Sequence, residues 1–325
     1  MDYSIFYKEE LPINKKWDYE ADVFITAYNT SDRCIELCKR MQSKETISII
    51  LPEYGYRDNE IPKNTNRIEY YQLFDQSEKL IVDNIFQKYK KNLNRKKLCI
   101  DITGFMRPQF MYIMKYLSTM KIKKFDVLYA EPVEYTKKEN TTFSDGKISD
   151  VRQVNGYEGD HIIGNTKEIL VIGSGYDYKL IQNVCDRKKN ADVIQIYGFP
   201  SLKADMIQQN ILAANMAYYE MQDGSVSQEA HFWTRPNVYY APANDPFETA
   251  NIISKIVNKA KQINNRLNIY LSPISSKPQT LGFAIYYLWE CINKPVSILY
   301  PITTKYQRET TVGISRVWKY SVELP

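Results

Sequence analysis

The sequence is poor in the residues that most metal and nucleophilic centres require. It contains two histidines, His161 and His231, in loop-like segments and without the spacing of metal ligands. A zinc site and a Ser–His–Asp triad are therefore not expected. The GxxxxGK[ST] motif is missing as well, which excludes a P-loop nucleoside triphosphatase. We expect neither a metal nor a bound cofactor.

Cysteine pairs and long apolar runs are also lacking. None of the five cysteines has CxxC spacing, which is typical of a reducing compartment without a disulfide framework. The N-terminus has no signal-peptide pattern, and the longest apolar run, residues 281–292, is too short for a bilayer and contains Glu290. We expect a cytoplasmic protein that does not cross a membrane.

Charge of one sign does not dominate the chain. The net charge of +5 over 325 residues is compatible with a phosphate-bearing ligand but does not require nucleic acid. The most basic stretch, residues 88–97, lies at the end of an expected helix, where the helix dipole favours cations. Apolar residues make up 44% of the chain, enough for a sizeable core.

Short apolar runs alternate with amphipathic segments, which predicts an α/β fold with mostly parallel sheets and helices on both faces. Antiparallel hairpins at 135–157 and around 313–323 would close the edges. The expected strands are 22–27, 46–51, 68–73, 98–102 and 125–130, then 168–173, 192–198, 238–241, 267–271 and 296–300. The expected helices are 32–41, 75–93, 109–120, 178–185, 206–221, 245–263 and 280–292.

The order of these elements repeats along the chain. The segment LCIDITGF in the first half corresponds to LNIYLSPI in the second, and FDVLYAEP corresponds to PVSILYPI. We interpret this as an internal duplication of two Rossmann-like lobes, residues 1–157 and 158–325. The duplication fits either a monomer or a homodimer.

Ligands of open α/β sheets bind beyond the carboxyl ends of the strands. Asp101 is a carboxylate inside an apolar strand, which costs free energy unless it is paired, and Arg107 is the nearest candidate partner. Thr103 and the Gly104 amide could then hold a phosphate or a ribose. We favour this ligand-binding interpretation over a purely structural one, in which Asp101 only fixes the turn.

The second half has its own strand-end turns. Gly173, Ser174 and Gly175 follow a strand and precede a helix, a context suited to an anion but also to a tight turn. The dinucleotide fingerprint would need glycine at Tyr178 and therefore fails. The remaining ligand candidates are Asp177, Ser272 and Lys277. Taken alone, Asp177 and Lys277 are more typical of solvated caps, as are the other lesser candidates Lys203, Asp205 and Asp245.

At DITGFMRPQFMYIMKYL the chain resembles CARF domains, Rossmann-like sensors of cyclic oligoadenylates in CRISPR-linked proteins. Asp101, Thr103 and Gly104 match the Asp-x-Thr-Gly turn of that family, Phe105 replaces its second glycine, and Arg107 stands near its lysine. In the second lobe Ser272 stands for the threonine, Pro273 for a glycine and Lys277 for the lysine. The duplicated layout is similar to SAVED domains. The resemblance implies a sensor of nucleotides or cyclic oligonucleotides in bacterial defence or signalling.

Three functions follow as hypotheses. The first is this sensor, which would act through a protein partner carrying an effector activity, because the chain has no visible nuclease segment. The second is a nucleotide-processing enzyme, a phosphodiesterase or transferase that uses Asp101 or Asp177 with Arg107. The third is a scaffold subunit whose strand-end turns are structural. We favour the first.

Overall fold

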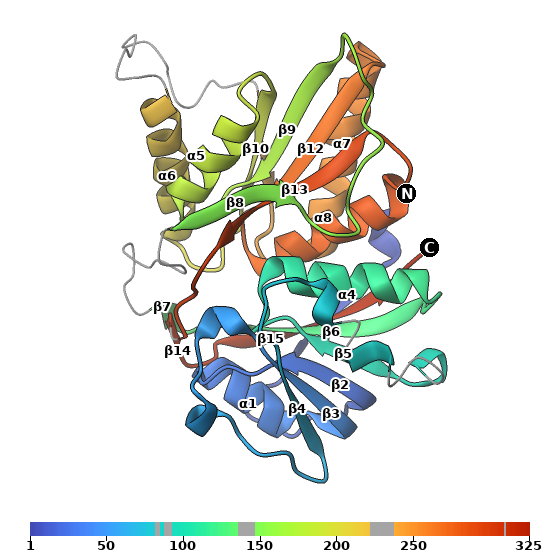
Figure 1. Cartoon of the computed structure of the whole chain (residues 1–325), viewed down its shortest axis with the longest axis vertical. Helices are drawn as coiled ribbons and strands as arrows, with labels where there is room; N and C mark the ends of the chain where they lie inside the picture. The colour runs from blue at the N-terminus through green and yellow to red at the C-terminus, as the bar shows by residue number, and fades with distance from the viewer. Residues whose placement is uncertain (82–84, 88–92, 136–146, 222–236, 309) are drawn as a thin grey trace. The chain divides into compact units, whose positions relative to one another are not determined.

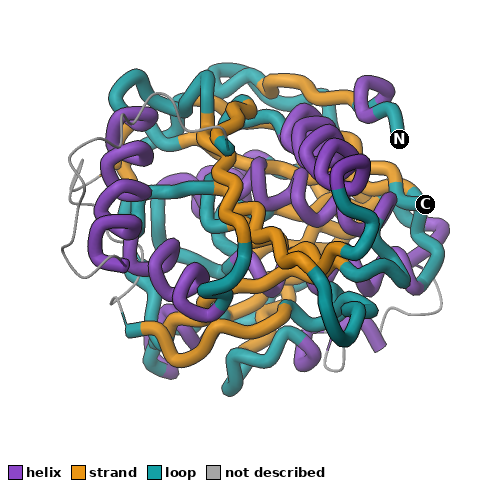
Figure 2. Tube along the Cα trace, turned by 90° about the horizontal axis from the view of Figure 1, so that it is seen from above, coloured by secondary structure: helices purple, strands orange, loops and turns teal. Residues whose placement is uncertain are grey.

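The computed structural model describes the chain except residues 82–84, 88–92, 136–146, 222–236 and 309. It is an α/β fold with two mostly parallel sheets, helices on both faces and antiparallel strands at the edges (Figures 1 and 2). The chain divides into two compact units, each built from segments that are distant in the sequence. Unit 1 comprises Met1–Ser4 and Gly146–Thr303, and unit 2 comprises Ile5–Asp145 and Thr304–Pro325.

Unit 2 contains a seven-stranded sheet in the order β1-β15-β6-β5-β2-β3-β4. Strands β2 to β6 are parallel, whereas β15 runs antiparallel to both β6 and β1. Buried apolar side chains such as Trp17, Phe24 and Leu37 form its core. The elements are β1 (Tyr7–Leu11), β2 (Glu20–Ala27), α1 (Asp32–Arg40), β3 (Gln42–Ile50), β4 (Ile68–Gln72), α2 (Lys79–Ile81), β5 (Leu98–Asp101), α4 (Arg107–Thr119), β6 (Lys124–Glu131), β7 (Glu134–Tyr135), β14 (Thr311–Val312) and β15 (Arg316–Glu323).

Unit 1 contains a six-stranded sheet in the order β11-β10-β9-β12-β13-β8. All its strands are parallel except β8, which runs antiparallel to β13. Helices α5 and α6 cover one face and α7 and α8 the other (Figure 1). The elements are β8 (Ile148–Gln153), β9 (Lys167–Gly173), α5 (Tyr178–Arg187), β10 (Asp192–Gly198), α6 (Met206–Met221), β11 (Val238–Ala241), α7 (Pro246–Ile263), β12 (Leu267–Pro273), α8 (Lys277–Glu290) and β13 (Val296–Thr303).

The two sheets repeat one strand order. Numbering the parallel strands of each unit along the chain gives 3-2-1-4-5 in both, with an antiparallel strand added beside strand 5. This order matches the first five positions of the Rossmann order 3-2-1-4-5-6. The predicted fold class is confirmed, and the shared strand order agrees with an internal duplication.

The antiparallel strands pair differently from the prediction. Residues 135–157 do not form a local hairpin, because β7 pairs with β14 and β8 pairs with β13. The turn expected at Asp145–Gly146 lies outside the described residues. The terminal strand β15 pairs with β6 and β1 rather than with β13. Strand β8 follows the parallel strands of unit 2 in the sequence but joins the sheet of unit 1. Strand β15 follows the parallel strands of unit 1 but joins the sheet of unit 2.

This exchange of strands moves the unit boundary. The predicted boundary at 157/158 differs from the division at 145/146, and the last 22 residues belong to unit 2. The expected helix 75–93 corresponds in part to α2 and a 3-10 turn at Leu93–Arg95, with residues 82–84 and 88–92 outside the described residues. Within the part of the chain that the structure describes, every helix is too short or too polar to span a bilayer.

Candidate functional site

The strand order places two switch points at the carboxyl ends of the sheets. A switch point lies where the direction of strand crossover reverses, here between β2 and β5 in unit 2 and between β9 and β12 in unit 1. Unit 2 brings the predicted residues 101–107 to the first, and unit 1 brings residues 173–177 and 272–277 to the second. All ten predicted ligand residues therefore lie at or next to a switch point.

At the unit 1 switch point, the predicted anion loop is closely packed against the neighbouring turn. A Cβ atom on Gly175 would lie 2.5 Å from the carbonyl oxygen of Ile274, and one on Gly173 would lie 2.7 Å from Ser275 Oγ. Ser174 is fully buried and its hydroxyl donates to Gln195 Oε1 at 3.1 Å. The glycines allow two strand-end turns to approach each other, so this geometry favours the tight-turn interpretation.

The helices that follow these turns already carry caps. Asp177 Oδ1 accepts a hydrogen bond from the Lys179 amide at 3.1 Å, so a carboxylate occupies the N-terminus of α5. Burial raises the pKa of Asp177, while backbone hydrogen bonds oppose that rise. Ser276 caps α8, one residue before Lys277, and Asp245 caps α7. An anion at α5 would face the Asp177 side chain, which argues against this position as a phosphate site.

At the unit 2 switch point, the Asp101 carboxylate fixes the turn that follows β5. It is fully buried, and it accepts from Thr26 Oγ1 at 2.9 Å and from the Thr103 amide at 2.8 Å. The Thr103 hydroxyl in turn accepts from the Ala130 amide at 3.0 Å. These bonds join the turn to β2 and β6. The geometry therefore supports the structural interpretation of Asp101 and Thr103, which the sequence analysis ranked second.

Gly104 and Phe105 complete the packing of this turn. A Cβ on Gly104 would lie 2.7 Å from the carbonyl oxygen of Ala27, and Tyr54 donates a hydrogen bond to the Gly104 carbonyl at 2.8 Å. Phe105, which replaces a glycine of the CARF pattern, is fully buried. The turn therefore presents little surface of its own to a ligand.

The helices at this switch point differ from those of unit 1. Neither Ser31 before α1 nor Met106 before α4 caps its helix through a side-chain hydrogen bond. Arg33 and Arg107 lie in the first turns of these helices, where the macrodipole disfavours cations, although Asp32 beside Arg33 is acidic. A helix start without a side-chain cap and with a guanidinium nearby is suited to hold an anion, although Pro108 supplies no amide N–H in the first turn of α4.

Arg33, Arg107, Tyr129 and Tyr135 form what we call the arginine–tyrosine cluster. Arg33 donates to the Ala130 carbonyl at 2.7 Å and to Thr311 Oγ1 at 3.0 Å, both neutral acceptors. Burial raises the pKa of both tyrosines, the nearby Glu131 carboxylate raises it further, and the two guanidinium groups act to lower it. The cluster therefore places two cations beside phenol groups at the carboxyl ends of β5 and β6.

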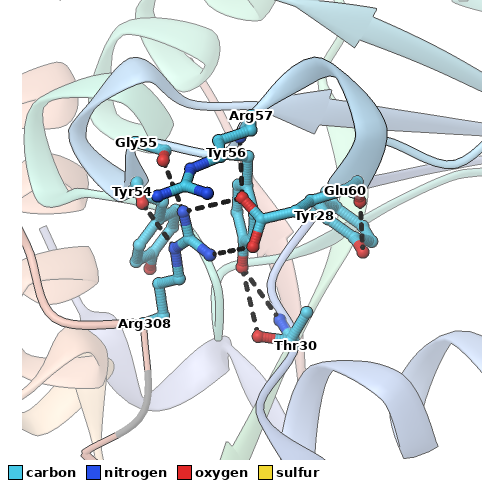
Figure 3. A network of polar contacts seen from close by, with 8 residues as sticks. All are labelled: Tyr28, Thr30, Tyr54, Gly55, Tyr56, Arg57, Glu60 and Arg308. Atoms are coloured by element: carbon cyan, nitrogen blue, oxygen red, sulfur yellow. Dashed lines mark hydrogen bonds and ion pairs between the residues drawn. The ribbon is translucent and has the colours of Figure 1, made fainter.

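A second group of side chains lies at the carboxyl ends of β2 and β3 (Figure 3). The Tyr28 and Tyr56 rings are 5.0 Å apart, and the Tyr54 and Tyr56 rings are 6.1 Å apart. The Arg308 guanidinium carbon lies over the Tyr56 ring, 4.1 Å from its centroid, and the same guanidinium pairs with Glu60. Tyr54 links the two groups, because its hydroxyl donates to the Gly104 carbonyl and its ring lies near enough to Arg33 to be affected by that charge. Burial raises the pKa of Tyr54, and Arg33 acts to lower it.

Sequence reasoning found Arg107 but missed Arg33, Tyr129 and Arg308. A cation in the first turn of a helix was a readable signal for Arg33. Tyr129 resembled an ordinary core residue of an apolar strand. Arg308 could not be assigned, because its position depends on the return of the C-terminal segment to unit 2.

Comparisons with known proteins add little to this geometry. No protein-family model and no curated protein matches the chain. One solved structure, described as the crystal structure of an N-terminal ketoreductase from a macrolactin assembly line, aligns with a TM-score of 0.23 and 11% identity. The alignment covers 90% of this chain and 72% of that one. A similarity this weak carries no argument about function.

Proposed function

We propose that the chain is a sensor or regulatory protein that binds a nucleotide or an oligonucleotide at the carboxyl edge of the unit 2 sheet. The arginine–tyrosine cluster at the switch point carries this proposal. Its guanidinium groups and the uncapped helix starts suit phosphate, and the nearby tyrosines suit a base. The ligand site thus moves from the Asp101 turn itself to the side chains around it.

The biological setting follows from the CARF and SAVED resemblance and remains part of the proposal. The sensor would act in the cytoplasm in bacterial defence or signalling, and a protein partner would supply the effector activity. Among the described residues no group of three or more histidine, cysteine, aspartate or glutamate side chains could hold a metal ion. The proposal assigns ligand binding to the described residues.

A thermal-shift screen of the full chain with mono-, di- and cyclic nucleotides tests this function. A ligand at a hundredfold over its dissociation constant stabilises a protein by about 2.7 kcal/mol, which is readily measured. Arg107→Ala should abolish the shift, and raised salt should reduce it. Arg95→Ala is the matched control, because Arg95 is an exposed arginine just before the amino end of β5.

Two results would contradict the proposal. The first is that no nucleotide stabilises either the wild-type chain or the Arg308→Ala variant, which lacks the side chain that lies over Tyr56. The second is that Arg107→Ala binds nucleotide as well as Arg95→Ala does.

A further inference from the structure

Four hydrogen bonds hold the Arg308 guanidinium. Its Nε donates to the Tyr54 carbonyl at 2.7 Å, and one Nη donates to the Gly55 carbonyl. Its two Nη atoms also donate to the two carboxylate oxygens of Glu60, at 2.7 and 3.2 Å. With the Tyr56 ring beneath it, this arrangement selects a flat group that presents parallel N–H donors (Figure 3).

Glu60 is held in place for this contact independently of Arg308. The Arg57 amide donates to Glu60 Oε2 at 2.8 Å, and the Tyr28 hydroxyl donates to the Glu60 carbonyl at 3.4 Å. The hydrogen bond from Arg308 is the largest of the effects that lower the pKa of the Glu60 carboxyl, but the Arg57 amide lowers it as well, so the group is an anion at neutral pH without Arg308 too. A charged bidentate acceptor therefore remains in the site when Arg308 leaves it.

Guanine shares with the guanidinium group the features that this site would recognise. One edge of the base carries the N1–H and N2–H donors in parallel, and its flat ring can stack on tyrosine. Adenine has a single exocyclic donor next to an acceptor nitrogen, so it would place a lone pair against the carboxylate. Hypoxanthine, the base of ITP, retains N1–H and lacks the N2 amino group.

Arg308 is placed so that it can be displaced. It lies in the segment that returns from β13 to unit 2, its side chain is 33% exposed, and that of Glu60 is 38% exposed. Ion pairs this exposed contribute little stability. A nucleotide is the occupant to which we commit, because Arg33 and Arg107 at the neighbouring switch point would attract its phosphates.

We propose that Tyr56 and Glu60 bind the guanine base of the nucleotide, and that Arg308 occupies this base site in the absence of ligand. The inference rests on the proposed nucleotide-binding function and names its base and its regulation. Phosphates at the arginine–tyrosine cluster and guanine at Tyr56 would place one ligand across the carboxyl ends of β2, β3 and β5. Release of Arg308 would loosen the returning segment 304–308, which is otherwise held by hydrogen bonds to Glu53 and Gln76, and would so signal that the ligand is bound.

Calorimetric titration of the full chain with GTP, ITP and ATP tests this inference, because the three ligands share their phosphates. Arg308→Ala should bind GTP about tenfold or more tightly than wild type, because the competing side chain is gone. The affinity of this variant for GTP should exceed its affinity for ATP by about tenfold to a hundredfold, and its affinity for ITP should lie between the two. Adding Glu60→Gln to Arg308→Ala should reduce GTP affinity to that of ATP, whereas adding Asp58→Asn, an exposed neighbour, should not.

Arg308→Lys is the second variant, in case alanine unfolds the chain. Lysine retains the charge of arginine but cannot donate two parallel hydrogen bonds to the carboxylate. The Arg308→Lys variant should therefore also bind GTP more tightly than the wild-type chain does. Equal affinity of Arg308→Ala for GTP and ATP would overturn the guanine assignment and leave the proposed function standing. Tighter binding of N-acetyl-arginine methylamide than of GTP would assign the site to a partner's arginine and also overturn it. No binding of any nucleotide to any variant would remove the proposed function together with this inference.

Discussion

At the scale of single residues, a buried carboxylate can be structural even where it lies at a ligand-binding edge. Asp101 resembled a binding residue because an isolated charge in an apolar strand requires a partner. Its partners include Thr26 and Thr103, which lie on the adjacent strand and in the next turn. The charge is therefore used to hold the switch-point turn in shape.

Asp101→Asn should destabilise unit 2 by about 2–3 kcal/mol, because an amide group would face a donor in place of one carboxylate oxygen. Urea unfolding measures the loss, with the exposed Asp18→Asn as a control that should be near neutral. Unchanged stability together with lost nucleotide binding would restore the direct ligand role of Asp101.

A second buried carboxyl group makes stability depend on pH. Burial raises the pKa of Glu53 to about 7, further raised by Glu78 and Asp75 and opposed by hydrogen bonds from the backbone and Gln109. Gln109 Nε2 donates to Glu53 Oε1 at 2.8 Å, while Glu53 Oε2 and Gln109 Oε1 have no hydrogen-bond partner among the described residues. Protonation of Glu53 would supply a donor that this side-chain pair lacks.

The folded chain therefore binds this proton more tightly than the unfolded chain, where the pKa is near 4.5. The stabilisation is fully present below pH 4.5 and is lost as the pH rises through 7. The free energy of unfolding should fall by about 2–3 kcal/mol between pH 5 and 8, and Glu53→Gln should remove most of that fall. Urea unfolding at several pH values measures it, and a variant that keeps the wild-type slope would contradict the assignment.

At the scale of elements, the strand-end turns show what a linear pattern can and cannot predict. Apolar periodicity identified each parallel strand of both sheets, since a buried strand must be continuously apolar. It misassigned the antiparallel strands β8 and β15, because the partner of an edge strand depends on the path of the chain. For the same reason it found Arg107 but not Arg308.

Close packing of the turn after β5 gives an element-scale prediction. Gly104→Ala would push a methyl group to 2.7 Å from the Ala27 carbonyl, and backbone cannot yield easily. We expect a loss of about 2–3 kcal/mol on chemical unfolding. Gly164→Ala is the control, since its φ of 101° gives backbone strain with no atom within 4 Å of the new Cβ. A smaller loss for Gly104→Ala than for Gly164→Ala would contradict the packing account.

At the scale of the whole molecule, the two halves share a sheet order but exchange their antiparallel strands. Residues 146–303 contain every strand of the unit 1 sheet, whereas residues 5–145 lack β15, which separates β1 from β6. The duplication therefore does not produce two independent halves of the sequence. Unit 2 depends on a segment that leaves unit 1 and carries Arg308 on the way.

Fragment expression tests this arrangement. Residues 146–303 should fold alone with a cooperative thermal transition, because their sheet is complete. Residues 5–145 should aggregate, because β6 loses its partner and exposes an unpaired edge, and adding residues 304–325 as a peptide should improve their solubility. Cooperative folding of residues 158–325 but not 146–303 would contradict the described division.

Hydrogen exchange of the full chain with and without saturating GTP tests the central claim most directly, because it locates the ligand on the chain. We predict slower exchange at Tyr28–Arg33, Tyr54–Glu60 and Thr103–Arg107 in unit 2, and faster exchange at 304–308 as Arg308 is released. Slower exchange confined to Gly173–Asp177 and Ser272–Lys277, or no change in either unit, would contradict a nucleotide site at the carboxyl edge of the unit 2 sheet.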